Sequence, residues 1–297
     1  MPPIAANIRT WGEMIKFSHS AFALPFALLA MFLAARPEAP GWGRFGLIVV
    51  CMVAARSAAM TFNRIADVRF DAANPRTANR PLQSGKISLA TAWSCFAGAC
   101  VLFVAGCGGF LAFFGNAWPL ILSLPVLGVL CFYSYTKRFT RWSHLVLGVA
   151  DALAPLGAWI AIDPTTLGVA TWLLMITVTF WIAGFDLIYA CQDVEFDRQA
   201  GLHSVPARMG IAAALWCARA FHVVTVAALV GVGLGAGLGF YYFVGVGCVA
   251  ALLIVENSLV HPNDLSRVNL AFFTVNGVVG LLLGGLGVLD VWLSTAG

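Results

Sequence analysis

The sequence predicts an all-α integral membrane protein with nine transmembrane helices in one bundle, arranged as two parallel four-helix repeats followed by a ninth helix. Composition, nine long apolar runs and a one-sided charge distribution predict this class. The chain has 297 residues, of which 61% are hydrophobic and 10% charged, and its mean hydropathy is +0.89. Soluble domains are much less apolar. We expect residues 1–297 to form a single membrane domain with its function in short loops.

Apolar runs long enough to cross a bilayer, which takes about 20 residues, define the expected helices. They cover residues 17–35, 45–62, 87–114, 117–135, 143–162, 167–190, 211–235, 238–259 and 270–294. The first run follows Arg9 and Lys16, as the apolar part of a signal peptide would. It is too long for that role and no small-x-small cleavage site follows it, so we expect a retained first span.

Positive charge predicts the orientation of these spans. If the N-terminus lies on one side, that side receives 13 of the 17 Lys and Arg residues. Arg36 and Arg44 fall on the opposite side, and Arg56 and Arg219 fall within spans. The positive-inside rule therefore predicts a cytoplasmic N-terminus and an outside C-terminus.

The remaining composition excludes several other classes of function. The eight cysteines contain no Cys-x-x-Cys and lie mostly within spans, which favours apolar packing over metal binding or disulfides. The net charge of +4 largely reflects the topology, and no basic patch interleaved with aromatics indicates nucleic-acid binding.

The first charged motif follows the second apolar run. Asn63, Asp67 and Asp71 are spaced four apart, which places all three on one face of a helix that continues out of the span. Like charges at this spacing repel, so the arrangement favours a bound cation between them. A solvated helix end is the alternative for an isolated Asp-x3-Asp.

The four-residue spacing recurs at Asp193 and Asp197, after the sixth run. Both motifs extend even-numbered helices and so face the same side, which suggests a parallel internal repeat. Four carboxylates and an amide oxygen are hard ligands that suit Mg²⁺, which takes one or two carboxylates per ion and fills its other positions with water or phosphate oxygens.

Basic residues accompany both motifs. Arginine forks match phosphate oxygens, so we expect a polyanion bridged by Mg²⁺. Basic cytoplasmic loops occur in any membrane protein, so the pairing with acidic helix ends is the stronger evidence. The basic residues concerned are Arg76, Arg80, Lys137, Arg138, Arg198 and Arg208.

Two further charges lie deeper in the spans, each seven residues before a motif. Arg56 precedes Asn63 and Asp186 precedes Asp193, which suggests a polar cavity entering from the cytoplasmic face. A structural ion pair between Arg56 and Asp186 is the alternative. Buried pairing and cavity lining both stay open for Asp151 and for the Arg219 and His222 pair.

Together these residues resemble the UbiA superfamily of intramembrane prenyltransferases. Asp193 and Asp197 match its second motif, and many members have Asn-Asp where this chain has Asn63 and Arg64, so one carboxylate is missing. Its Tyr-x3-Lys-Arg is matched by Tyr133, Lys137 and Arg138. Its first motif is matched by Asn63, Asp67, Asp71, Arg76, Thr77, Arg80, Pro81, Leu82 and Gly85.

The resemblance implies Mg²⁺-dependent transfer of a polyprenyl group from its diphosphate to an aromatic ring, with release of diphosphate. Arg56 would orient the carboxylate of the acceptor, and Tyr133 would lie near the ring or the diphosphate. Two Mg²⁺ ions would be held by Asn63, Asp67, Asp71, Asp193 and Asp197, and the four aspartates and Lys137 would be catalytic. The implied substrate-binding residues are Arg56, Asn63, Arg76, Arg80, Tyr133, Arg138, Asp186, Tyr189 and Arg208.

Residues 13–31 and 184–208 most resemble the bacterial inner-membrane branch that prenylates 4-hydroxybenzoate in quinone biosynthesis. That branch also resembles enzymes acting on a dihydroxynaphthoate in menaquinone synthesis, so the acceptor stays open, as do the tail length and the general base. A transporter is the second hypothesis, although inverted repeats and mid-membrane ion sites would be expected for it. A phosphatidyl-type phosphotransferase would carry an Asp-Gly-x2-Ala-Arg run, which the sequence lacks.

Overall fold

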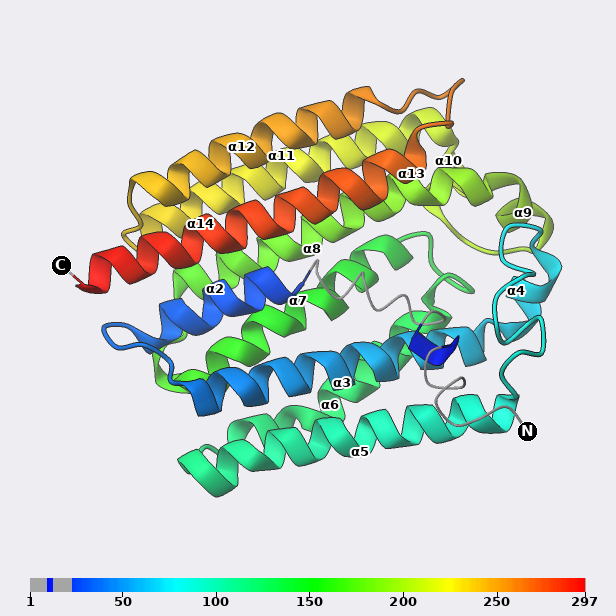
Figure 1. Ribbon diagram of the computed structural model, residues 1–297. Coiled ribbons are helices and arrows are strands. Elements are labelled where there is room, and N and C mark those ends of the chain that lie inside the picture. The colour runs from blue at the N-terminus through cyan, green and yellow to red at the C-terminus, as the bar shows by residue number, and fades with distance from the viewer. Residues whose placement is uncertain (1–9, 13–22, 297) are drawn as a thin grey trace. The chain divides into compact units, whose positions relative to one another are not determined.

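Figure 1 shows the computed structural model, which describes residues 10–12 and 23–296. The described chain is helical throughout its regular structure, as predicted. Short 3₁₀ segments cover Pro164–Thr166 (η2) and Cys191–Asp193 (η3), and a π-helix covers Ala271–Val275 (η4). The α-helices are α2 (Leu24–Ala35), α3 (Trp42–Ala66), α4 (Val68–Ala73), α5 (Leu89–Phe114), α6 (Trp118–Thr136), α7 (Ser143–Ile162), α8 (Val169–Ala190), α9 (Val194–Gln199), α10 (Val205–Met209), α11 (Ile211–Gly235), α12 (Phe240–Ser258), α13 (Val268–Leu270) and α14 (Asn276–Ala296).

Among the described residues, eight helical segments are long and apolar enough to cross a membrane, and each overlaps one of the last eight predicted runs. The first predicted run, 17–35, begins outside the described residues, as do Arg9, Lys16 and much of the segment 13–31. Its described part is α2, an apolar helix of 12 residues. The total of nine spans and the division into two repeats therefore remain predictions.

Large apolar side chains cover much of the outer helix surfaces. Phe113 at the end of α5 is 76% exposed, and Leu234 near the end of α11 is 72% exposed. In water such surfaces would be unfavourable, whereas hydrocarbon tails accommodate them. Composition and surface together identify an integral membrane protein.

The chain divides into two compact units. The described part of the first comprises α3 from Gly46 onward, α4, α5, and α6 up to Tyr135. Ala54 and Ala58 of α3, Phe103 of α5 and Leu127 of α6 share one buried cluster. Ser88 caps α5 by accepting a hydrogen bond from the backbone N–H of Thr91.

The described part of the second unit comprises α2, the first turn of α3, and α7 to α14. Here α8 packs against both α7 and α11, while α14 packs against α12 and α2 (Figure 1). Gly148 of α7 lies directly against the backbone carbonyl of Thr179 in α8, so no Cβ fits there. These close contacts fix α8, whose end leads into the second aspartate motif.

Candidate active site

The first aspartate motif lies at a helix junction. Asp67 separates α3 from α4 and has φ −93° and ψ 11°, in the sparsely populated bridge region. The N–H of Asp67 donates to the carbonyl of Asn63 at 3.0 Å, and the N–H of Asp71 donates to the carbonyl of Asp67 at 2.8 Å. The three residues therefore follow one another at one-turn intervals, as their spacing predicts, although the helix is interrupted between them.

The second aspartate motif repeats this local structure. α8 passes through η3 into α9, and Asp193 precedes α9 with φ −104° and ψ 6°. Asp197 lies within α9. The segments 67–71 and 193–197 read Asp-Val-Arg-Phe-Asp and Asp-Val-Glu-Phe-Asp, so they differ only in their central residue. The spacing of the aspartates alone predicted the second motif, and the shared Val and Phe are a further signal for the repeat.

Arginines surround the first motif. Asp71 Oδ2 accepts a hydrogen bond from Arg80 Nη1 at 2.6 Å and lies 3.8 Å from Arg64 Nη1. Asn63 Nδ2 lies within 3.4 Å of Asp67 Oδ2, to which it donates. Arg64 was not predicted as a site residue, and its position next to Asn63 in the motif was the available signal.

A serine organises the second motif. Ser204 Oγ donates to Asp197 Oδ2 at 2.8 Å and accepts from the N–H of Ala207 at 3.3 Å, which caps α10. Arg198 Nε donates to the carbonyl of Ala207 at 3.0 Å. The loop after α9 is therefore tied back onto that helix through the carboxylate of Asp197. Ser204 was not predicted as a site residue.

One face of α8 leads to Asp193. Asp186 Oδ2 and His144 Nδ1 share a hydrogen bond of 2.7 Å, so Asp186 has a partner within its own unit. The pair between Arg56 and Asp186 stays a hypothesis. Tyr189 stacks on Phe272 of the π-helix with ring centroids 4.3 Å apart. Both predicted substrate-binding side chains of α8 are thus held by neighbouring helices.

The other predicted residues are half-buried or exposed. Arg56 is half-buried in α3, and Tyr133 is half-buried in α6. Lys137 and Arg138, just after α6, are also half-buried, while Arg76 is exposed in the loop after α4.

Arg219 and His222 of α11 have different partners in the structure. The guanidinium of Arg219 lies 4.6 Å from the ring centroid of Trp216. His222 Nδ1 lies 2.7 Å from Asn257 Nδ2, in a site where the histidine is only 3% exposed. Each side chain therefore has its own partner on α11 or α12.

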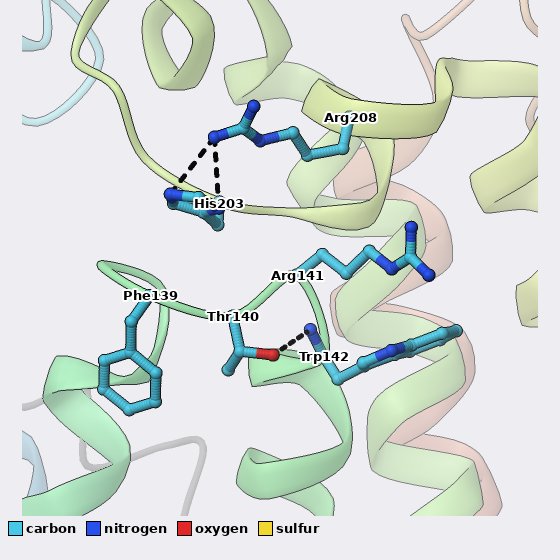
Figure 2. Close-up of a pocket in the computed structure, with 6 residues that line it drawn as sticks. All are labelled: Phe139, Thr140, Arg141, Trp142, His203 and Arg208. Atoms are coloured by element: carbon cyan, nitrogen blue, oxygen red, sulfur yellow. Dashed lines mark hydrogen bonds between the residues drawn. The ribbon is translucent and has the colours of Figure 1, made fainter.

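An open pocket of about 460 Å³ lies beside the second motif. Figure 2 shows Arg208 pointing toward His203, with Nη2 3.1 Å from both ring nitrogens. The N–H of His203 donates to the carbonyl of Lys137 at 2.6 Å, which joins the pocket to the loop after α6. The pocket is lined by Phe139, Thr140, Arg141, Trp142, His203 and Arg208.

The donor atoms of each motif fit a hard divalent cation. Within the part of the chain that the structure describes, no three His, Cys, Asp or Glu side chains converge into a metal cluster. Each motif instead offers two aspartates, and the first adds an amide oxygen. This is the number of carboxylates that Mg²⁺ usually takes when phosphate oxygens and water complete its coordination.

These features define a helical membrane protein with two aspartate motifs of matching local structure. A family model for the UbiA prenyltransferase family matches residues 23–293. The chain belongs to the UbiA prenyltransferase family and is an enzyme of that class.

Two relatives are more than 30% identical to this chain over the matched regions. The chain is 32% identical over 210 residues to a 4-hydroxybenzoate octaprenyltransferase of Pseudomonas aeruginosa, covering 71% of this chain and 69% of the relative. It is 31% identical over 231 residues to a mitochondrial 4-hydroxybenzoate polyprenyltransferase of Aedes aegypti, covering 77% of this chain. The matched region spans half the length of that mosquito protein.

Solved structures share the fold. The apo structure of a UbiA homolog from Aeropyrum pernix K1 matches with a TM-score of 0.82 and 31% identity, over 92% of this chain and 98% of that one. A UbiA homolog from Archaeoglobus fulgidus, bound to GPP and Mg²⁺, matches with a TM-score of 0.74 and 20% identity, over 95% and 99%.

Proposed function

We propose that the protein transfers a polyprenyl group from polyprenyl diphosphate to the aromatic ring of a 4-hydroxybenzoate-like acid in quinone biosynthesis, in a reaction that needs Mg²⁺. The observation that carries the proposal is the pair of aspartate motifs with the same backbone conformation at Asp67 and Asp193. The names of the curated relatives support the acceptor class.

The aspartate motifs would bind the metal. Asn63, Asp67 and Asp71 would hold one Mg²⁺ ion, and Asp193 and Asp197 a second. When bound, the ions supply positive charge to the diphosphate as its bond to the prenyl group weakens. A UbiA homolog from Archaeoglobus fulgidus that shares this fold was solved bound to GPP and Mg²⁺, which supports the proposal.

Basic side chains would neutralise the rest of the leaving group. The allylic C–O bond breaks and its electron pair leaves with the diphosphate, where Lys137 and the arginines stabilise the growing charge. The aromatic ring then attacks the allylic carbon and gives its proton to a base. A site within a membrane helix bundle excludes the water that would otherwise capture the allyl cation. The arginines concerned are Arg76, Arg80, Arg138 and Arg208.

The acceptor would lie deeper than the diphosphate. Arg56 would bind the carboxylate of the aromatic acid through a bidentate pair. Tyr133 and Tyr189 would contact the ring or the diphosphate, and Asp186, held by His144, would line the same cavity. A dihydroxynaphthoate is the alternative acceptor, because it offers the same electron-rich ring and carboxylate.

The proposal includes the placement of this site in the membrane. The charge distribution supports an N-terminus and an active site that face the cytoplasm and a C-terminus that lies outside. The similarity to bacterial relatives supports the bacterial inner membrane as the location. We further propose that residues 1–297 act as one functional domain.

Competition between acceptors tests the assignment. Purified protein in lipid is supplied with a polyprenyl diphosphate, Mg²⁺ and an equimolar mixture of 4-hydroxybenzoate and a dihydroxynaphthoate, and products are identified by mass spectrometry. We expect prenylated hydroxybenzoate to predominate. Prenylated naphthoate as the main product would reassign the acceptor. The absence of both product and diphosphate release would favour the transporter hypothesis.

A further inference from the structure

Arg64 is a buried cation inside the first aspartate motif. It lies in the last turn of α3 and is only 7% exposed. Its Nη1 is 3.4 Å from Asn63 Oδ1, to which it donates, and 3.8 Å from Asp71 Oδ2. Among the described residues, its buried Nε atom has no hydrogen-bond partner. A buried guanidinium with unsatisfied N–H donors is unfavourable unless an anion accepts the remaining hydrogen bonds.

Arg64 and Arg80 converge on the same oxygen atom. Both Nη1 atoms approach Asp71 Oδ2, at 3.8 Å and 2.6 Å. One carboxylate oxygen cannot satisfy two guanidinium groups, and the two positive charges repel each other. The pair therefore retains the capacity to bind a further anion, and a diphosphate offers several oxygens in the geometry that guanidinium groups prefer.

The atoms that contact Arg64 are also atoms that a metal ion would use. Asn63 Oδ1 and Asp71 Oδ2 are two of the oxygen ligands that the first motif offers to Mg²⁺. An arginine and a divalent cation cannot both occupy the positions in front of these oxygens, because their charges repel at such short distances. Arg64 thus lies against two of the ligand atoms of the first motif.

We propose that Arg64 competes with the metal ion for the first motif and releases Asn63 and Asp71 when a diphosphate replaces them as its partner. The inference rests on the proposed function and deepens it, since it makes metal binding at the first motif dependent on the substrate. Because binding free energies are reciprocally linked, the metal also strengthens diphosphate binding by the same factor. In the second motif, the side chain that donates to the Asp197 carboxylate is the uncharged hydroxyl of Ser204 rather than an arginine.

Metal titration isolates this competition. The full chain carrying Asp193→Asn and Asp197→Asn retains only the first motif, and Mn²⁺ binding to it is measured by calorimetry without diphosphate. Adding Arg64→Gln removes the competing charge, so we expect Mn²⁺ to bind about tenfold more tightly, the size of one charge-assisted hydrogen bond. Arg64→Lys keeps the charge and should retain the weak binding.

Arg69→Gln is the matched control, because Arg69 is an exposed arginine of the adjacent helix α4. It should leave Mn²⁺ affinity unchanged. A second titration uses inorganic pyrophosphate and EDTA with both motifs intact. Here Arg64→Gln should bind pyrophosphate about tenfold more weakly than the unsubstituted chain, and Arg69→Gln should bind it equally well.

Unchanged or weaker Mn²⁺ binding in Arg64→Gln would overturn the competition. The acceptor assay separates this result from the proposed function, since a chain that forms prenylated product while Arg64→Gln leaves Mn²⁺ affinity unchanged refutes the competition alone. A chain that forms no product with either acceptor refutes the proposed function, and the Mn²⁺ titration then still decides the role of Arg64.

Discussion

Asp67 and Asp193, far apart in the chain, have nearly the same backbone conformation, with φ and ψ of −93° and 11° in one and −104° and 6° in the other. Each precedes a helix of six residues that carries the second aspartate of its motif. Few residues adopt a bridge-region backbone conformation, and many of those that do lie at active sites. Its occurrence at both positions supports the same role for the two motifs.

The first prediction concerns Asp193. Asp193→Asn removes a proposed metal ligand with almost no change in volume, so we expect the rate of product formation to fall roughly 100-fold. Glu195→Gln is the control, since it removes an equal charge two residues later from an exposed side chain. Rates are compared by product mass spectrometry, and equal losses in both variants would argue against a specific role for Asp193.

The second prediction concerns Ser204, whose hydroxyl donates to Asp197 Oδ2 at 2.8 Å. Partners of metal ligands typically alter metal affinity by about 10- to 100-fold, so Ser204→Ala should raise the Mg²⁺ concentration for half-maximal rate by about tenfold. The exposed Ser258 provides the control Ser258→Ala. If Ser204→Ala left the Mg²⁺ concentration for half-maximal rate unchanged, Asp197 would be oriented without this hydrogen bond.

The third prediction concerns a buried polar network in the second unit. Asn276 accepts from Trp181 Nε1 and donates to Glu256 Oε1, both at 2.7 Å, and Glu256 and Asn276 are fully buried. Asn276→Ala leaves the other two groups without this partner and should lower the free energy of unfolding by about 2 kcal/mol.

Glu256→Gln keeps the acceptor oxygen that faces Asn276 and serves as the control for this network. We expect it to lower stability by less than about 1 kcal/mol. Thermal unfolding in detergent compares the two variants. If Glu256→Gln were as destabilising as Asn276→Ala, the carboxylate itself would be required rather than the hydrogen bond.

The fourth prediction tests the contact between α7 and α8. Gly148→Ala places a methyl group against the Thr179 carbonyl, so the helices must separate, which should destabilise the protein by roughly 2 kcal/mol. Gly157 lies in the same helix with no atom within 4 Å of an added Cβ. Gly157→Ala should therefore leave the unfolding temperature unchanged or slightly raised, and a similar decrease in both variants would contradict the packing argument.

The sequence predicted the helices well because apolar runs of membrane length have few alternatives. Eight of the predicted runs correspond to candidate spans in the described part of the chain. The one-turn spacing of Asn63, Asp67 and Asp71 was also legible. The break at Asp67 was not, since it preserves the helical hydrogen bonds on either side and leaves no Gly or Pro signal.

Side-chain partners were much harder to predict. Arg64 resembled an ordinary basic residue at the end of a cytoplasmic helix, and its convergence with Arg80 on Asp71 depends on how the loop after α4 folds back. Asp186 is hydrogen-bonded to His144 of another helix, and Glu256 is hydrogen-bonded to Asn276. Such pairs depend on tertiary packing, for which a single sequence carries no periodic signal.

The most direct test of the central claim measures prenylated product formed by the purified chain in lipid with a polyprenyl diphosphate and 4-hydroxybenzoate. Reactions with Mg²⁺ and with EDTA are compared for the unsubstituted chain and for Asp67→Asn. We predict product and stoichiometric diphosphate only for the unsubstituted chain with Mg²⁺, with roughly 100-fold less for Asp67→Asn. Equal product with EDTA, or from Asp67→Asn, would contradict the account that the aspartate motifs bind metal and diphosphate.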